Sequence, residues 1–189
     1  YFIDANIFIR VLTQDDPAQS PKSLAFLERI ADGHVSGMVT EGVILEVIQV
    51  LASKHQYGLD RSEIRERILP LFMLPNLQVQ HREIQLAAIE LFAESRLDYV
   101  DCLAIAYARL LELQGIVSFD QGLDRLVNEL RVEPDMVPDN CGAQSPRTQF
   151  KADDCTSYSL SNSVFRTYEE HALTVLEDLN TDDQVVLAR

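Results

Sequence analysis

The chain has 189 residues, of which 47% are hydrophobic, so it is long enough for one ordinary domain with an extension and can bury a full core. It carries 30 acidic against 16 basic residues, and this net charge of −14 excludes nucleic-acid binding by bulk electrostatic attraction. Any such binding must be local, through a metal ion or an arginine cluster. No apolar run reaches the roughly 20 residues of a membrane helix, and the N-terminus has no basic-then-apolar leader, so we expect a soluble cytoplasmic protein.

The three cysteines, Cys102, Cys141 and Cys155, form neither a C-x-x-C pair nor an even disulfide framework. This argues against a zinc site and against a secreted disulfide scaffold. Reduced thiols are the expectation, and a bridge between Cys141 and Cys155 stays open as an alternative.

The first eight residues are an apolar run interrupted by Asp4 and Asn6. Three apolar residues that end at an acid predict a buried parallel strand with Asp4 at its carboxyl end, the edge where open α/β sheets bind ligands. A lone buried carboxylate is costly, and a bound metal ion would explain its presence. The plain alternative is that Asp4 caps a helix that starts near Ile7. This stretch alone does not decide between them.

Helical and strand patterns then alternate along the chain. Asp16 and Pro17 predict a helix start, and Asp60 with Glu63 resembles a capping box. The expected helices cover 7–12, 23–31, 40–55, 60–73, 83–94, 97–108 and 121–130, and the expected strands cover 34–39, 77–79 and 115–120, with another beginning at Val132. This alternation predicts an α/β fold, a three-layer doubly wound sheet of mainly parallel strands.

The composition changes after residue 133, which divides the chain into three parts. Residues 1–138 are expected to form the main domain, 139–163 a linker or extended arm, and 164–189 a helix and a short strand. The helix has an apolar face over 168–179, and the strand is expected at 185–187. Because that face is too apolar to stay in water alone, we expect it to pack on the domain, a dimer mate or the active-site rim.

Four acids stand out by position in this pattern. Asp4 and Asp120 end strands, Asp101 lies near a helix start, and Glu46 sits at the margin of an apolar helix face. In a doubly wound sheet these positions share one edge, where mutual repulsion would raise their pKa values unless a cation were present. Oxygen ligands of this kind suit Mg²⁺ or Mn²⁺. With four histidines and no H-E-x-x-H, the sequence argues against a zinc protease.

Each acid also has a plain structural interpretation. Glu46 is then a solvated helix residue, Asp101 a first-turn acid favoured by the helix dipole and paired with the cap Asp98, and Asp120 a helix cap. One shared site explains the positions of all four acids more simply than four separate structural roles.

The motifs together resemble a known family. They are Asp4-Ala5-Asn6 after the first strand, Glu46 on the second long helix, Asp101 within 99–106, and Ser118-Phe119-Asp120 after a later strand. Their order and spacing are similar to those of the PIN-domain nucleases, most closely the VapC toxins of bacterial toxin–antitoxin pairs, over about residues 1–138. The resemblance implies a metal-dependent endoribonuclease in which Asp4, Glu46, Asp101 and Asp120 hold Mg²⁺ or Mn²⁺ and a metal-activated water attacks the RNA phosphodiester.

The resemblance also implies roles for neighbouring residues and for partners. Asn6 and Ser118 fall on polar helper positions that orient a carboxylate or a water, and Asp124 is an optional extra acid. Arg10 is a surface residue, a substrate-phosphate ligand or the arginine that an antitoxin neutralises, the first being preferred. Members of this family are known for homodimers and for a cognate antitoxin.

Other functions are also consistent with parts of the pattern. Haloacid dehalogenase phosphatases need an acid where Asn6 stands, and response-regulator receivers need a late strand-end lysine that this chain lacks. The more serious alternative is a PIN-like fold kept as an RNA- or protein-binding module with little or no cleavage. The presence of all four acids favours the nuclease.

Overall fold

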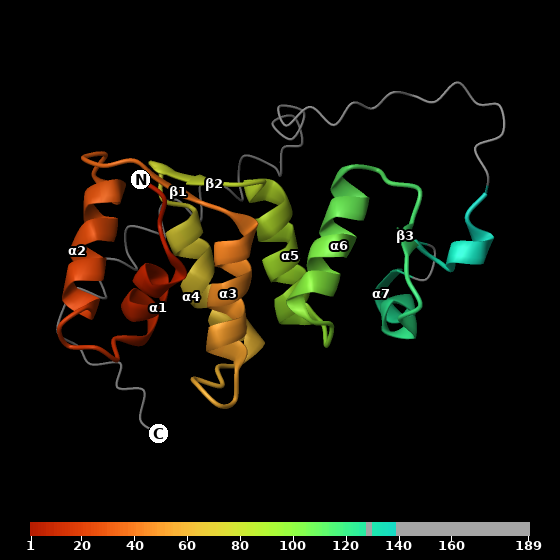
Figure 1. Ribbon diagram of the computed structural model, residues 1–189, viewed down its shortest axis with the longest axis horizontal. Coiled ribbons are helices and arrows are strands. Elements are labelled where there is room, and N and C mark those ends of the chain that lie inside the picture. The colour runs from red at the N-terminus through yellow and green to blue at the C-terminus, as the bar shows by residue number, and fades with distance from the viewer. Residues whose placement is uncertain (128–129, 139–189) are drawn as a thin grey trace.

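The computed structural model describes residues 1–127 and 130–138 of the chain (Figure 1). Its helices are α1 (Ala5–Thr13), α2 (Ser20–Ala31), α3 (Glu41–Ala52), α4 (Arg61–Phe72), α5 (Arg82–Glu94), α6 (Tyr99–Leu110) and α7 (Asp124–Val127). Its strands are β1 (Gly37–Val39), β2 (Leu77–Val79), β3 (Ile116–Val117) and β4 (Arg131–Val132), with 3-10 turns η1 (Gln121–Leu123) and η2 (Pro134–Met136). Strands and helices alternate as predicted, which confirms the α/β class.

The two predicted helix starts have different outcomes. Asp16 does cap the first turn, as predicted, because its Oδ1 accepts the backbone N–H groups of Ala18 and Gln19 and its carbonyl accepts that of Ser20. The regular part of α2 begins at Ser20, after this turn. Asp60 does occupy the N-cap of α4, but the capping box is absent, since neither reciprocal bond forms and Glu63 instead pairs with Arg67 at 2.6 Å.

The predicted boundaries differ most where short polar segments flank an apolar run. The helix predicted for 40–55 ends at Ala52, and the strand predicted for 34–39 is limited to Gly37–Val39. The stretch predicted as one helix over 121–130 starts as the 3-10 turn η1, because the Asp120 side chain accepts the Gly122 N–H and tightens this turn. These differences do not change the order of the elements.

The strands pair in parallel, as predicted, but form two short sheets rather than one. β1 pairs with β2 in the register Gly37↔Leu77, and the first stretch joins this sheet through a parallel bridge between Phe2 and Met38. β3 pairs with β4 in the register Ile116↔Arg131. Figure 1 shows β3 and α7 beyond α6, with α5 and α6 between them and α1.

The core is divided in the same way. The main hydrophobic cluster runs from Ile3 through α1–α5 to Ala106 of α6, and Phe8 and Phe72 meet edge to face within it at 5.3 Å. A second cluster has three buried residues, Ile105 of α6 with Leu123 and Val127, against which the partly buried Leu91, Leu97, Ile116 and Leu130 pack. Gly37 lets β1 pass through the main core, because a Cβ there would lie 2.4 Å from Ile3 Cδ1. The sheet of β3 and β4, called the small sheet below, is thus held mainly through α6 to the rest of the described chain, which is called the body.

Several sequence predictions fall outside the described residues. They concern the arm over 139–163, the helix and strand within 164–189, and the pairing of Cys141 with Cys155. Cys102 is described, as a buried free thiol with its Sγ 3.6 Å from Ser95 Oγ. Among the described residues, none of the helices has the length and apolar character needed to cross a membrane.

Candidate functional site

Asp4 lies where the sequence predicted, at the end of the first strand-like stretch and directly before α1. It occupies the N-cap position, yet its side chain makes no cap hydrogen bond. Its Oδ2 instead accepts a bond of 2.9 Å from Asn6 Nδ2, and both side chains are exposed. The carboxylate is therefore held by an amide at the protein surface, where it keeps free lone pairs for a ligand.

Asn6 and Glu46 line the same pocket, which has a volume of about 480 Å³. Asn6 comes from the first turn of α1 and Glu46 from the middle of α3, and α1 and α3 pack together. Arg10, Asp15, Gln56 and Tyr57 complete its polar lining. The structure thus brings together two of the predicted site positions and places Arg10 beside them.

A hydrogen-bonded chain fixes Arg10 at this pocket. Arg10 Nη1 donates to both carboxylate oxygens of Asp15, at 2.8 and 2.7 Å, and Tyr57 donates its hydroxyl to Asp15 Oδ2 at 2.5 Å. Burial alone would raise the pKa of Asp15, but the bonds from Tyr57 and Arg10 outweigh it and hold this pKa below its usual value. Asp15 stays ionised and orients the guanidinium. No helical or strand spacing in the sequence places Asp15 or Tyr57 beside Arg10, so neither residue was predicted at the site.

A second group of acids lies at the start of α6. Asp98 caps this helix by accepting the backbone N–H of Asp101 at 2.9 Å. The pKa of Asp101 is raised, first by burial and then by the negative charges of Asp98 and Asp120. The negative charges of Asp101 and Asp120 therefore repel each other across the junction between α6 and β3.

Asp120 and Ser118 form a tight turn after β3. The Ser118 hydroxyl accepts the backbone N–H of Asp120 at 3.0 Å, and Asp120 Oδ1 accepts the Gly122 N–H at 2.7 Å. Ser118 thus orients the backbone that carries the acid. The optional acid Asp124 is paired with Arg131 Nε at 2.5 Å, and Arg131 also donates to the Ser118 carbonyl. In this structure Asp124 ties α7 to β4.

The four predicted acids do not converge on one point. Asp4 and Glu46 belong to the α1–α3 side, whereas Asp101 and Asp120 lie at α6 and β3 (Figure 1). Within residues 1–127 and 130–138, no three His, Cys, Asp or Glu side chains come close enough to hold a metal ion together. The all-oxygen donors fit Mg²⁺ or Mn²⁺ chemically, and the crowding around Asp101 would be relieved by a cation. The physical reason for the separation is the split sheet, which keeps the end of β3 away from Asp4.

A third polar cluster was not anticipated from the sequence. Glu41 Oε1 contacts His81 Nδ1 at 2.6 Å and accepts the Tyr107 hydroxyl, so the ring proton is assigned to Nδ1. Glu41 follows β1 by two residues and His81 follows β2 by two. Glu41 and His81 therefore share with Asp4 the position just after a strand that marks a candidate site residue. The cluster joins α3, α5 and α6.

Comparison with known proteins gives one match. The family model described as PIN domain matches residues 1–129, more than half of the chain. The match includes Asp4, Glu46, Asp101 and Asp120. No curated protein and no solved structure matches the chain significantly.

Proposed function

Because the chain belongs to the PIN domain family, whose members are usually metal-dependent nucleases, we propose that it is an endoribonuclease that uses Mg²⁺ or Mn²⁺ to hydrolyse RNA phosphodiester bonds. The observation that carries the proposal is the acid pair Asp101 and Asp120. Burial and the charges of Asp98 and Asp120 raise the pKa of Asp101, so its ionised form lacks a counter-charge. A divalent cation would supply one.

In this proposal Asp101 and Asp120 hold the ion. Asp4 and Glu46 are assigned to the same group of metal ligands because they match the family pattern. The bound ion would polarise the phosphodiester and lower the pKa of an attacking water. Asp98 fixes the backbone of Asp101, and Ser118 fixes that of Asp120. Asn6 orients the carboxylate of Asp4. No side chain is required as nucleophile, because the acids act through charge and position.

Arg10 has the position of a phosphate ligand in this scheme. It lines the pocket that Asn6 and Glu46 share. Its guanidinium is fixed there by hydrogen bonds to Asp15, whose carboxylate also accepts the Tyr57 hydroxyl. A guanidinium presents several N–H donors to a phosphate at once. Because Asp15 already neutralises much of its charge, we expect Arg10 to orient the RNA strand more than to attract it.

The biological setting that fits such an enzyme is a toxin–antitoxin pair. We propose a VapC-like toxin that acts in the cytoplasm, forms a homodimer and is inhibited by a cognate antitoxin at the acidic site. The support is the motif pattern of Asp4, Glu46, Asp101 and Asp120 together with the family match.

A binding module with little or no cleavage is the second candidate function. The observation that favours it is the separation of the acids, since no three of them gather within the described residues. Such a module would bind RNA or a protein through the same face without hydrolysing a bond.

Cleavage of a mixed pool of structured RNAs in Mn²⁺ or Mg²⁺ tests the proposal. The unchanged chain is compared with Asp101→Asn, with an EDTA control and with Asp32→Asn, an exposed acid at the end of α2 that provides a matched substitution. Cleavage that is lost with EDTA and in Asp101→Asn but kept in Asp32→Asn supports the nuclease. Folded protein, freed of any co-purifying partner, that cleaves nothing in either metal would favour the binding module.

A further inference from the structure

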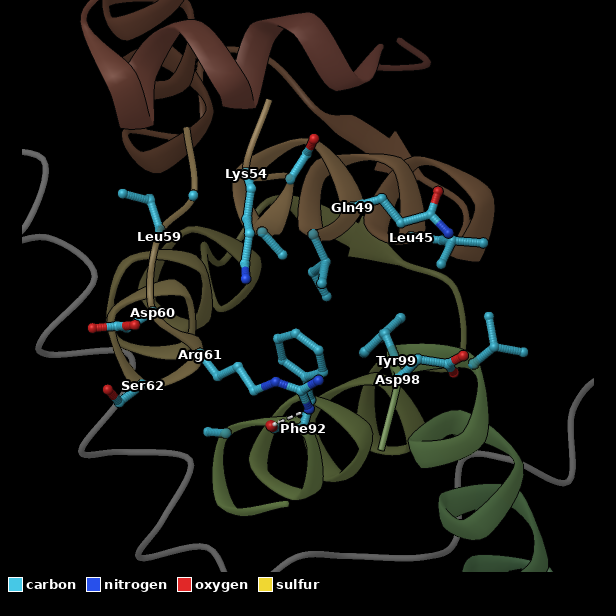
Figure 2. Close-up of a pocket in the computed structure, with 16 residues that line it drawn as sticks. Leu45, Gln49, Lys54, Leu59, Asp60, Arg61, Ser62, Phe92, Asp98 and Tyr99 are labelled. Atoms are coloured by element: carbon cyan, nitrogen blue, oxygen red, sulfur yellow. Dashed lines mark hydrogen bonds between the residues drawn. The ribbon is translucent and has the colours of Figure 1, made fainter. Parts of the chain in front are cut away.

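A second pocket, larger than the one that holds Glu46, opens beside the acids of α6. Its volume is about 780 Å³, and its wall combines the C-terminal half of α3, the loop to α4, and the ends of α5 and α6 (Figure 2). Asp98, Tyr99 and Val100 of the first α6 turn belong to its lining, and Asp101 follows them directly. On α3, Gln49 lines this pocket three residues after Glu46, which lines the other. Both pockets therefore flank the same helix.

Lys54 supplies an unneutralised positive charge to this pocket. Figure 2 shows its side chain reaching from the end of α3 toward the middle of the cavity, while Asp60 and Ser62 point away from it. In the described part of the chain Lys54 makes no ion pair. Four of the described arginines, Arg10, Arg65, Arg67 and Arg131, are each paired with a carboxylate, whereas Arg61 in this pocket bonds to backbone carbonyls.

The Arg61 guanidinium, stacked on the buried Phe92 ring, forms a rigid floor opposite Lys54. Arg61 donates to the carbonyls of Phe92, Ser95 and Leu97 in the last turn of α5 and just beyond it, and its guanidinium carbon lies 4.3 Å from the centre of the Phe92 ring. These bonds satisfy carbonyls that the helix end leaves without partners. They also fix the guanidinium on the Phe92 ring, which is only 4% exposed. The plane of the guanidinium is therefore the flat surface of this floor, of the kind on which unstacked bases rest.

We propose that this pocket is a subsite for one nucleotide of the RNA strand, in which Lys54 binds the phosphate and the guanidinium plane of Arg61, held on the Phe92 ring, receives the base. The proposal rests on the proposed ribonuclease function and names where the strand continues beyond the acids. A pocket of this volume accommodates a nucleotide. In a chain with a net charge of −14, a local cation is what allows a polyanion to approach.

The subsite is tested by binding, without cleavage. The affinity of a short, fluorescently labelled single-stranded RNA is measured by anisotropy in EDTA across a series of salt concentrations. For Lys54→Gln we expect a dissociation constant raised about threefold to fivefold, the size of one exposed charge contact. The slope of log affinity against log salt should fall by about 0.7, the value for one phosphate contact on a single strand.

Lys22→Gln is the matched control, because Lys22 is also exposed and lies on α2, away from this pocket. It should leave both the affinity and the salt slope unchanged, and Lys54→Arg should retain most of the binding. Equal binding by Lys54→Gln and the unchanged chain would overturn the subsite, as would a chain that binds no RNA in this assay. If the unchanged chain still cleaves RNA in Mn²⁺, such a result rejects the subsite alone and leaves the nuclease standing.

An acidic segment of a partner protein is the other ligand that a free lysine could hold. In that case Lys54→Gln would bind RNA as the unchanged chain does while losing an acidic peptide, and the proposal would be wrong. The variants are expected to fold, since Lys54 is exposed and makes no contact that the core needs.

Discussion

The body that carries Asp4 and Glu46 and the small sheet that carries Asp120 are built with very different amounts of core. The body packs α1–α6 around one large cluster, whereas β3, α7 and β4 are attached through a small cluster with three buried residues, Ile105, Leu123 and Val127, and a few partly buried ones. Val117 and Phe119 are 56% and 75% exposed, and Phe2 at the edge of the body sheet is 62% exposed. Each sheet thus keeps one edge with apolar side chains facing solvent.

This difference has a consequence for the site. Acids on the body are positioned by helices that cannot shift without opening the main core, whereas Asp120 is positioned by a turn and a two-stranded sheet. A small unit with few buried contacts opens at a lower free energy than the rest of the molecule. Of the acids in the proposed site, Asp120 is therefore on the part of the described chain that is most easily displaced.

The largest expected effect contrasts the two cores directly. Phe8→Ala removes a fully buried ring that packs edge to face on Phe72, and we expect a loss of about 3–5 kcal/mol in the free energy of unfolding. Leu123→Ala, in the small cluster, should cost about 2 kcal/mol at most, because its site can collapse. Urea denaturation measures the first, and hydrogen exchange of β3 and β4 measures the second. A global loss of equal size in both variants would show that the two regions unfold as one unit.

The second prediction asks whether the two regions serve one reaction. Asp4→Asn in the body and Asp120→Asn in the small sheet should each lower RNA cleavage by at least about a hundredfold, because charge stabilisation by positioned groups is worth that much. Residues that act as a unit are non-additive, so the double variant should be no worse than either single one. Single-turnover cleavage rates in Mn²⁺ test this. Full activity in Asp4→Asn would assign the chemistry to the α6–β3 acids alone.

The third prediction compares one substitution in both sheets. Val39→Thr in β1 buries a hydroxyl at a position with no exposure, and should cost about 1–3 kcal/mol. Val117→Thr in β3 places the same hydroxyl in solvent and should stay within about 0.5 kcal/mol. Thermal unfolding of the two variants checks the contrast. A large loss in the free energy of unfolding for Val117→Thr would mean that the Val117 side chain is buried in solution.

The smallest effect is electrostatic and concerns Asp101. Its pKa is raised in the folded chain by burial and by Asp98 and Asp120, so folding is favoured while the carboxyl is protonated at low pH. This contribution is lost as the pH rises through the raised pKa. In metal-free buffer, the unfolding midpoint of the unchanged chain should therefore fall relative to that of Asp101→Asn between acidic and neutral pH. Added Mg²⁺ should remove the difference, and a midpoint difference that does not vary with pH would contradict the assignment.

Much of the candidate site follows from local sequence patterns. Asp101 was expected near the start of a central helix, and the structure places it in the first turn of α6. Asp120 was expected at the end of a strand over 115–120, but β3 ends at Val117 and Asp120 is the N-cap of η1. Asn6 was expected to orient a carboxylate, and it does bond to Asp4. The roles of these residues in catalysis stay predictions. The anchoring of Arg10 by Asp15 and Tyr57 could not be read from the sequence, because Tyr57 is 42 residues from Asp15.

The sequence by itself determined the order of helices and strands, their parallel pairing, and which acids end up at element boundaries. These features depend on local periodicity and on short polar residues that interrupt apolar runs. Only the tertiary structure decided that the strands form two sheets, that the stretches preceding Asp4 and Asp120 join different ones, and that Lys54 faces a pocket beside Asp98. Those outcomes depend on which edges and faces meet over long sequence distances, and the alternation of polar and apolar residues does not encode that choice.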